Sequence, residues 1–168
     1  MELFRLAILV NSFEQQRVLN LCLKGACFAG FEFNLWFSLY FVRDNEVELY
    51  GKSASRDFLL EISDIWWFDD ECEWEKRVLS EGEGAQPDEP VKAFELAKFR
   101  WSGGGDVESV IVREQITIIQ FVGGRTINIR TTEDDEHSYA LYDNTFSEIS
   151  SKWSLKVDSD LTYLLVPD

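Results

Sequence analysis

The residues with the clearest capacity for chemistry form one short run, from Ile65 to Glu75 (IWWFDDECEWE). Three tryptophans alternate there with five carboxylates. Tryptophan is enriched at the energetic centres of interfaces, and carboxylates around an aromatic anchor suit arginine and lysine through paired hydrogen bonds and cation–π contacts. The run therefore predicts a partner-binding surface made of Trp66, Trp67, Asp69, Asp70, Glu71, Glu73, Trp74 and Glu75.

The same carboxylates allow a second interpretation. Grouped acids can bind a hard cation or act as an acid–base pair, which would make the chain a carboxylate-dependent or divalent-metal-dependent enzyme. The spacing of an EF-hand calcium loop is absent, and carboxylates this dense in sequence usually form a solvated face. We therefore expect no catalytic, metal-binding or cofactor-binding residue and no cofactor, and the enzyme stays as the alternative. A structural or scaffold subunit is a further alternative.

The histidine, the glycine-rich segments and the cysteines of the chain form no catalytic or ligand-binding motif. The one histidine, His137, follows the acids 133–136 without a serine in a nucleophile-elbow context, and we expect a solvated loop residue. The glycines at 103–105 and 123–124 lack the spacing of phosphate-binding loops and predict turns. Three cysteines without framework spacing indicate a reducing compartment.

The 168-residue chain is strongly acidic, with 31 acids, 16 bases and a formal net charge of -15. Between Asp57 and Glu95 there are 13 acids and only 3 bases. This charge argues against nucleic acid and anionic membranes as partners and favours a basic protein. No secretory signal or membrane-spanning run is visible, so we expect a cytoplasmic protein.

In this profile the chain resembles bacterial toxin-immunity proteins, which are small, acidic, aromatic-rich cytosolic antidotes to basic nuclease toxins. The resemblance rests on the run from Trp66 to Glu75 and on the acidic segment that continues to Glu89, not on an alignable motif. It implies tight, stoichiometric binding of a cationic toxin domain made by the same cell. Carboxylates would then mimic or oppose the phosphate that the toxin contacts.

Strand patterns indicate how the run is positioned. Residues Asp57–Phe68 predict a strand whose apolar phase changes at Ser63–Asp64, where a bulge or break would let the chain change faces. Trp66 and Trp67 must point to opposite faces, so we expect one of them in the core. A short helix capped by Asp69 should follow.

The clearest single element is a β-hairpin over Gln115–Thr131. Two glycines, Gly123 and Gly124, separate two β-branched runs and predict a two-residue turn that pairs Val122 with Arg125. In this register Ile116, Ile118, Ile127 and Ile129 share one buried face. Ile119 and Phe121 would lie on the other face, where we expect a helix to cover them; the alternative is a small apolar patch for a partner.

Further patterns complete the fold. Residues Phe31–Val42 alternate large apolar groups and predict one long strand. Helical patterns fall at Phe13–Lys24 and at 146–153, and the alternation within Val91–Trp101 favours a strand. Adjacent strand pairs without regular β–α alternation predict an α+β fold, predominantly antiparallel, with a curved sheet or partial barrel and about two helices. We expect a single domain, 1–168, with an acidic exposed segment near 69–90.

Overall fold

Three helices and eleven strands make up the described part of the chain. The structure is a computed structural model and describes residues 5–49, 52–103, 105–132, 138–144, 153–158 and 161–167. In chain order the elements are β1 (Arg5–Val10), α1 (Ser12–Leu23), β2 (Cys27–Phe33), β3 (Phe37–Leu49), β4 (Lys52–Ile62), β5 (Trp66–Phe68), α2 (Glu71–Glu81), α3 (Asp88–Trp101), β6 (Val107–Arg113), β7 (Ile116–Phe121), β8 (Thr126–Arg130), β9 (Tyr139–Asp143), β10 (Ser154–Val157) and β11 (Thr162–Pro167).

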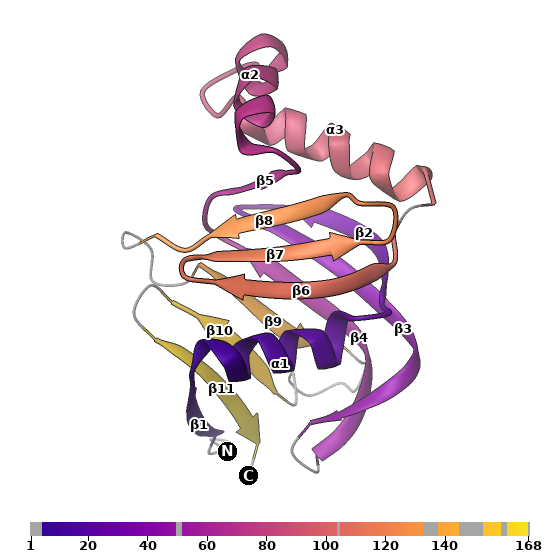
Figure 1. Cartoon of the computed structure of the whole chain (residues 1–168), viewed down its shortest axis with the longest axis vertical. Helices are drawn as coiled ribbons and strands as arrows, with labels where there is room; N and C mark the ends of the chain where they lie inside the picture. The colour runs from indigo at the N-terminus through magenta and orange to yellow at the C-terminus, as the bar shows by residue number, and fades with distance from the viewer. Residues whose placement is uncertain are drawn as a thin grey trace.

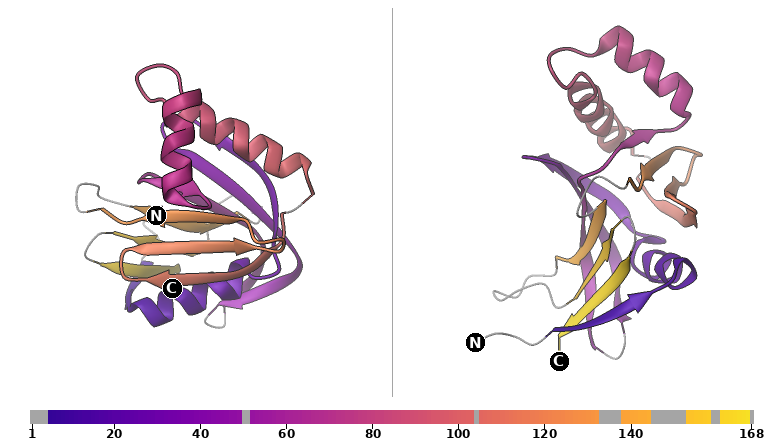
Figure 2. Two further views of the ribbon diagram at one scale, coloured as in Figure 1. Left: turned by 45° about the horizontal axis from the view of Figure 1, so that its top comes forward. Right: turned by 90° about the vertical axis from the view of Figure 1, so that its left-hand side faces the viewer.

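The strands form two antiparallel sheets that lie in two layers (Figures 1 and 2). The larger sheet has the order β1-β11-β10-β9-β4-β3-β2, and the smaller has the order β5-β8-β7-β6. Helix α1 runs beside β6, whereas α2 and α3 lie together at the opposite end of the molecule (Figure 1). The predicted α+β class with a curved antiparallel sheet is confirmed; the described strands close no barrel, and the described helices are three.

The predicted hairpin forms, but its register differs by one residue from the expected register. Strands β7 and β8 pair Gln120 with Thr126. The connection has three residues, 122–124, because the Phe121 N–H donates to the Arg125 carbonyl at 2.9 Å. Gly123 and Gly124 both have positive φ, at 101° and 91°, which glycine adopts without steric cost.

This one-residue shift turns the other face of β7 toward the buried face of β8, because side chains alternate along a strand. The buried apolar positions are Ile119, Phe121, Ile127 and Ile129. Ile116 and Ile118 were expected in the core and are only half-buried on the opposite face. Ile127 and Ile129 of β8 are thus buried as expected, whereas on β7 the core contact is made by Ile119 and Phe121 in place of Ile116 and Ile118.

The single strand expected over Phe31–Val42 is also wrong, because the chain reverses within it. Strands β2 and β3 pair with each other, and the turn at 34–36 is closed by the Asn34 N–H, which donates to the Trp36 carbonyl at 3.2 Å. Large apolar residues occupy every second position on both sides of this turn and within it, so the sequence pattern did not indicate the turn. Phe37 is buried as expected, whereas Leu35 is 83% exposed.

The phase change at Ser63–Asp64 marks the point where the chain passes from one sheet to the other. Strand β4 belongs to the seven-stranded sheet and β5 to the four-stranded sheet. The Asp64 carboxylate holds this corner, because it accepts hydrogen bonds from the Ile65 N–H at 2.8 Å, the Thr132 N–H at 2.7 Å and the Ser138 hydroxyl at 3.0 Å. The predicted break is confirmed.

Residues Val91–Trp101, expected as a strand, lie within helix α3. Its buried residues Val91, Glu95 and Phe99 recur every four positions, which is helical spacing. Asp88 and Glu89 occupy the first turn, where carboxylates complement the helix dipole. The strand prediction rested on apolar residues at every second position up to Trp101, and Trp101 is 88% exposed.

Helix α1, predicted over Phe13–Lys24, covers the free edge of the small sheet. Asn20 donates to the Val110 carbonyl at 2.6 Å and accepts from the Val110 N–H at 2.8 Å. Gln16 accepts from the Val112 N–H at 2.8 Å. The outward backbone groups at Val110 and Val112 are therefore satisfied by side chains.

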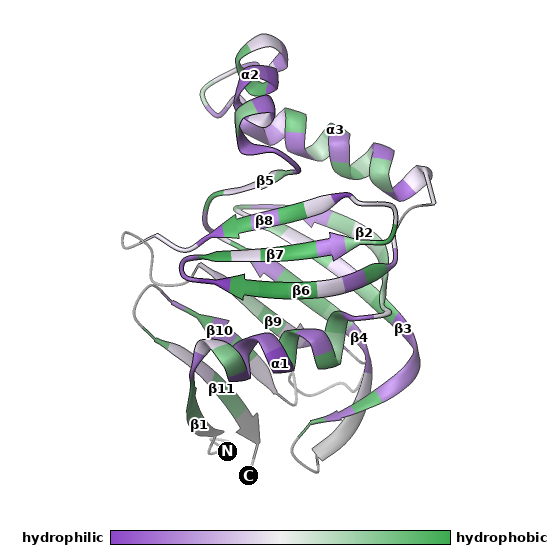
Figure 3. Ribbon diagram, in the orientation of Figure 1, coloured by the Kyte–Doolittle hydropathy of each residue, from purple (hydrophilic) through white to green (hydrophobic). Residues whose placement is uncertain are grey.

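One continuous apolar core lies between the sheets and extends under α3. Strands β6, β7 and β8 are mainly apolar, whereas much of α2 is hydrophilic (Figure 3). Within the described residues, no helix is both long and apolar enough to cross a membrane. The helix expected at 146–153 falls mostly outside the described residues, of which Trp153 is buried.

Candidate functional site

Strand β5 and helices α2 and α3 position the aromatic–acidic run. The chain turns sharply after β5 at Asp69, whose φ is 57°. Asp70, not Asp69, caps α2, because its side chain accepts from the Glu73 N–H at 3.0 Å. The eight residues of the predicted surface are thereby divided among a buried strand, the turn at Asp69 and Asp70, and the first turns of a helix.

All three tryptophans of the run are buried, although only one of Trp66 and Trp67 was expected in the core. Their exposed fractions are 2% for Trp66, 5% for Trp67 and 7% for Trp74. Trp66 meets Phe37 edge to face at 5.2 Å. Trp66 and Trp67 do point to opposite faces of β5, but both faces of this three-residue edge strand are covered. Both rings are therefore buried.

Most of the acids in the run are already paired within the chain. Asp69 pairs with Arg125 at 2.7 Å, Glu71 with Arg130 at 2.7 Å and Glu73 with Lys76 at 3.0 Å. Arg130 also lies over the Trp67 ring at 4.9 Å, which is a cation–π distance. The exposed Glu75 side chain accepts no hydrogen bond from any described residue.

Glu95 is the acid that sequence reasoning missed. Its side chain is 4% exposed and pairs with Arg77 at 2.5 Å, Arg125 at 2.8 Å and Lys98 at 3.2 Å. Burial raises the pKa of Glu95, but the hydrogen bonds from these cations outweigh burial and lower the pKa to about 2. The residue joins α2, α3 and the β7–β8 turn. If α3 had been recognised as a helix, the position of Glu95 four residues from both Val91 and Phe99 would have placed this acid on the buried face.

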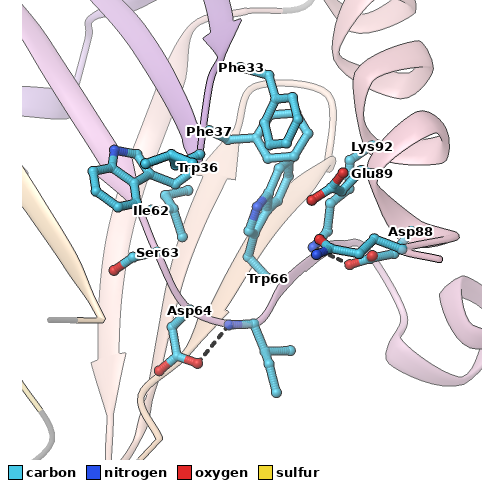
Figure 4. A pocket seen from close by; sticks show the side chains of 13 residues that line it. Phe33, Trp36, Phe37, Ile62, Ser63, Asp64, Trp66, Asp88, Glu89 and Lys92 are labelled. Atoms are coloured by element: carbon cyan, nitrogen blue, oxygen red, sulfur yellow. Dashed lines mark hydrogen bonds and ion pairs between the residues drawn. The ribbon is translucent and has the colours of Figure 1, made fainter. Parts of the chain in front are cut away.

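Two neighbouring cavities open at this end of the molecule. The first, the charged cavity, has a volume of about 230 Å³ and lies between the β2–β3 turn, the β4–β5 corner and the start of α3. Figure 4 shows Trp36 on one side of it, Asp88, Glu89 and Lys92 on the other, and the rings of Phe37 and Trp66 between them.

The second, the apolar cavity, has a volume of about 350 Å³ and lies between β5 and α2. Ile65 and Leu79 bring apolar groups to it that are 51% and 86% exposed, and Glu71 and Glu75 bring carboxylates. Both cavities are lined by Ile65, Trp66 and Asp88. We refer to the two together as the groove.

The groove includes five of the eight predicted site residues. Trp66, Trp67, Glu71, Trp74 and Glu75 line it. Asp69, Asp70 and Glu73 line neither cavity. Sequence reasoning also missed Trp36, Lys92 and Glu89, which come to the groove from the β2–β3 turn and from α3. His137 lies outside the described residues.

Lys92 is the buried base of the groove. Its ammonium group donates to Asp88 at 2.7 Å and lies 5.0 Å from the centre of the Trp66 ring. Burial lowers the pKa of Lys92, and the hydrogen bond from the ammonium to Asp88 opposes that effect only in part. The ammonium is therefore held between a carboxylate and an indole.

Comparison with known proteins finds no match. No family model, no curated protein and no solved structure resembles this chain. Nor do any three His, Cys, Asp or Glu side chains of the described residues stand close enough together to hold a metal ion. The chemistry that the groove offers is contact: exposed aliphatic groups beside carboxylates that face solvent.

Proposed function

We propose that this chain is a non-catalytic cytoplasmic binding protein that neutralises a basic protein partner, most directly a cognate bacterial toxin, as toxin-immunity proteins do. The observation that carries the proposal is the groove, in which exposed Ile65 and Leu79 stand beside Glu71 and Glu75. A partner surface with a large apolar side chain flanked by arginine or lysine complements this arrangement.

Size and charge support a protein partner. An apolar cavity of about 350 Å³ is large enough for an aromatic or leucine side chain. The net charge of -15 would steer a cationic protein toward the chain over distances beyond direct contact. Leu79 is 86% exposed, so a partner that docked on the apolar cavity would remove this side chain from water.

The enzyme alternative has less support in the geometry. It requires two or more acids of the run to converge on one site. Glu71 and Asp69 are instead paired with different arginines, Asp70 caps a helix and Glu73 pairs with a lysine on its own helix. The acids thus face four different partners.

Capture from the native cell tests the proposal. The tagged chain should retain one basic protein at a one-to-one ratio, and adding the chain should inhibit the toxic activity of that protein. Glu75→Lys and Leu79→Asp should each weaken binding by about 30-fold or more, because both side chains line the apolar cavity. Asp69 and Asp70 are unsuitable for this test, since their reversal would break an ion pair and a helix cap.

Glu73→Lys is the matched control, because Glu73 lies on the same helix, lines neither cavity and loses only an exposed pair with Lys76 on that helix, which contributes little to stability. It should change affinity only a few-fold. Equal losses for Glu73→Lys and Glu75→Lys would show that only net charge matters and would contradict a binding groove. A captured partner that is acidic, or whose activity the chain leaves untouched, would contradict the proposed function itself.

A further inference from the structure

The charged cavity differs from the apolar cavity in the kind of side chain that it suits. Its lining combines half-exposed aromatic rings with three carboxylates, of which Lys92 neutralises one. We propose that this cavity receives an arginine side chain of the basic partner, with the guanidinium group against the exposed rings of Phe33 and Trp36 and its N–H groups directed to Glu89; the source of the arginine rests on the proposed function.

Glu89 is the carboxylate that is available for a new hydrogen bond. Asp64 already accepts bonds from Ile65, Thr132 and Ser138, and Asp88 accepts from Lys92. The Glu89 carboxylate accepts no hydrogen bond from the described residues and meets the Lys92 ammonium only through the attraction of their charges. It is partly exposed at the start of α3. An incoming cation would thus find one acceptor whose lone pairs are free.

Two aromatic rings provide the surface on which a flat cation can rest. Phe33 and Trp36 are each 40% exposed and line the cavity from the β2–β3 hairpin. Figure 4 shows Trp36 on the side of the cavity opposite the charged groups of α3. A cation in the cavity would meet the exposed rings of the β2–β3 hairpin and the carboxylates at the start of α3.

Lys92 does not close the cavity to a second cation. Its ammonium is held by Asp88 at 2.7 Å and by the Trp66 ring at 5.0 Å. Asp64 and Glu89 leave an excess of negative charge in the lining. The guanidinium group is favoured over an ammonium because it is planar, stacks on indole, binds a carboxylate through two N–H groups and is more weakly hydrated.

The test uses three blocked amino acids and does not require the partner. The ¹⁵N-labelled full chain is titrated to about 50 mM with N-acetyl-arginine amide, N-acetyl-lysine amide or N-acetyl-citrulline amide, and the Trp36 indole and Ile65 amide signals are followed. The arginine compound should saturate with a Kd of about 1–10 mM. The lysine compound should bind about fivefold more weakly, and the uncharged citrulline compound about tenfold more weakly.

Two pairs of variants locate the site. Glu89→Gln and Trp36→Ala should each weaken arginine binding by about fivefold or more. Glu108→Gln and Trp101→Ala are the controls, because they remove an exposed acid of β6 and an exposed tryptophan at the end of α3, and neither lines the cavity. They should leave the Kd unchanged.

The outcomes separate this inference from the proposed function. Equal affinity for arginine and citrulline compounds, no saturation by 50 mM, or an unchanged Kd in Glu89→Gln would each overturn the arginine pocket. Capture of an inhibited basic partner whose affinity is the same for Glu89→Gln would overturn the pocket and leave the proposed function standing. Saturable arginine binding by a chain that captures no basic partner would overturn the proposed function and support the pocket.

Discussion

Glu95 is nearly inaccessible to water and still carries a charge, because three cations surround its carboxylate. Removing one member of a buried ionic group is costly, since the remaining charges lose their partner while they stay desolvated. Here Arg77 and Arg125 would both lose their contact with α3. The residue therefore holds the helices that form one wall of the groove.

The pKa of Glu95 makes this contribution dependent on pH. Its pKa is lowered from 4.5 to about 2, so the stabilisation is present above pH 4.5 and is lost as pH falls toward 2. We predict that Glu95→Gln lowers the free energy of unfolding by about 3 kcal/mol at pH 7. The gap between the two proteins should narrow steadily below pH 4.5, as urea unfolding would measure.

Glu108→Gln is the comparison, because Glu108 is an exposed acid on β6. Its unfolding curve should follow that of the parent chain across the same pH range. A constant gap between Glu95→Gln and the parent from pH 7 to pH 3 would mean that the Glu95 carboxylate is not the titrating group.

The surroundings of a residue were predictable from the sequence only where they do not depend on residues far away along the chain. The break at Ser63–Asp64 followed from local pattern and is confirmed. Trp66 and Glu75 line the groove, and their part in binding stays a prediction. The pairing of Asp69 with Arg125 joins residues 56 positions apart, and no local pattern indicates it. Charge density in sequence thus overestimated how many acids are free to meet a partner.

Among the elements, α1 and the β4–β5 break were predictable from the sequence, whereas the register of β7 with β8 and the helical state of α3 were not. The register depends on whether the turn has two or three residues, and Val122-Gly123-Gly124 is compatible with both. In α3 the sequence from Ala97 to Trp101 alternates like a strand, while burial follows a period near four. Packing against the rest of the protein determined both the register of the hairpin and the helical state of α3.

The α2–α3 connection is closed tightly at Gly82. A Cβ at this position would lie 2.5 Å from the backbone oxygens of both Val78 and Pro87. We predict that Gly82→Ala lowers the free energy of unfolding by about 2 kcal/mol, because neither backbone oxygen can move without displacing a helix end. Urea denaturation measures the change.

Gly30→Ala provides the matched substitution, because a Cβ at Gly30 meets no atom within 4 Å and the backbone needs no positive φ there. It should leave stability within about 0.5 kcal/mol of the parent. Equal effects of the two substitutions would exclude close packing at Gly82 as the cause.

At the scale of the whole molecule, charge should govern how fast a partner arrives more than how long it stays. With a net charge of -15, we predict that the association rate constant of the captured basic partner falls about tenfold or more between 50 and 500 mM salt. The dissociation rate constant should change far less, because it depends on desolvated contacts in the groove. Stopped-flow mixing measures both, and a salt-independent association rate would contradict electrostatic steering.

The contacts of α1 with β6 have a consequence for the behaviour of the protein in a crowded cell. A free strand edge recruits further strands and starts aggregation. Because Asn20 and Gln16 occupy the outward backbone groups of β6, another chain must first break three hydrogen bonds to add a strand there. With this edge closed, an aromatic-rich chain can accumulate to high concentration, which the proposed role as a stoichiometric antidote would require.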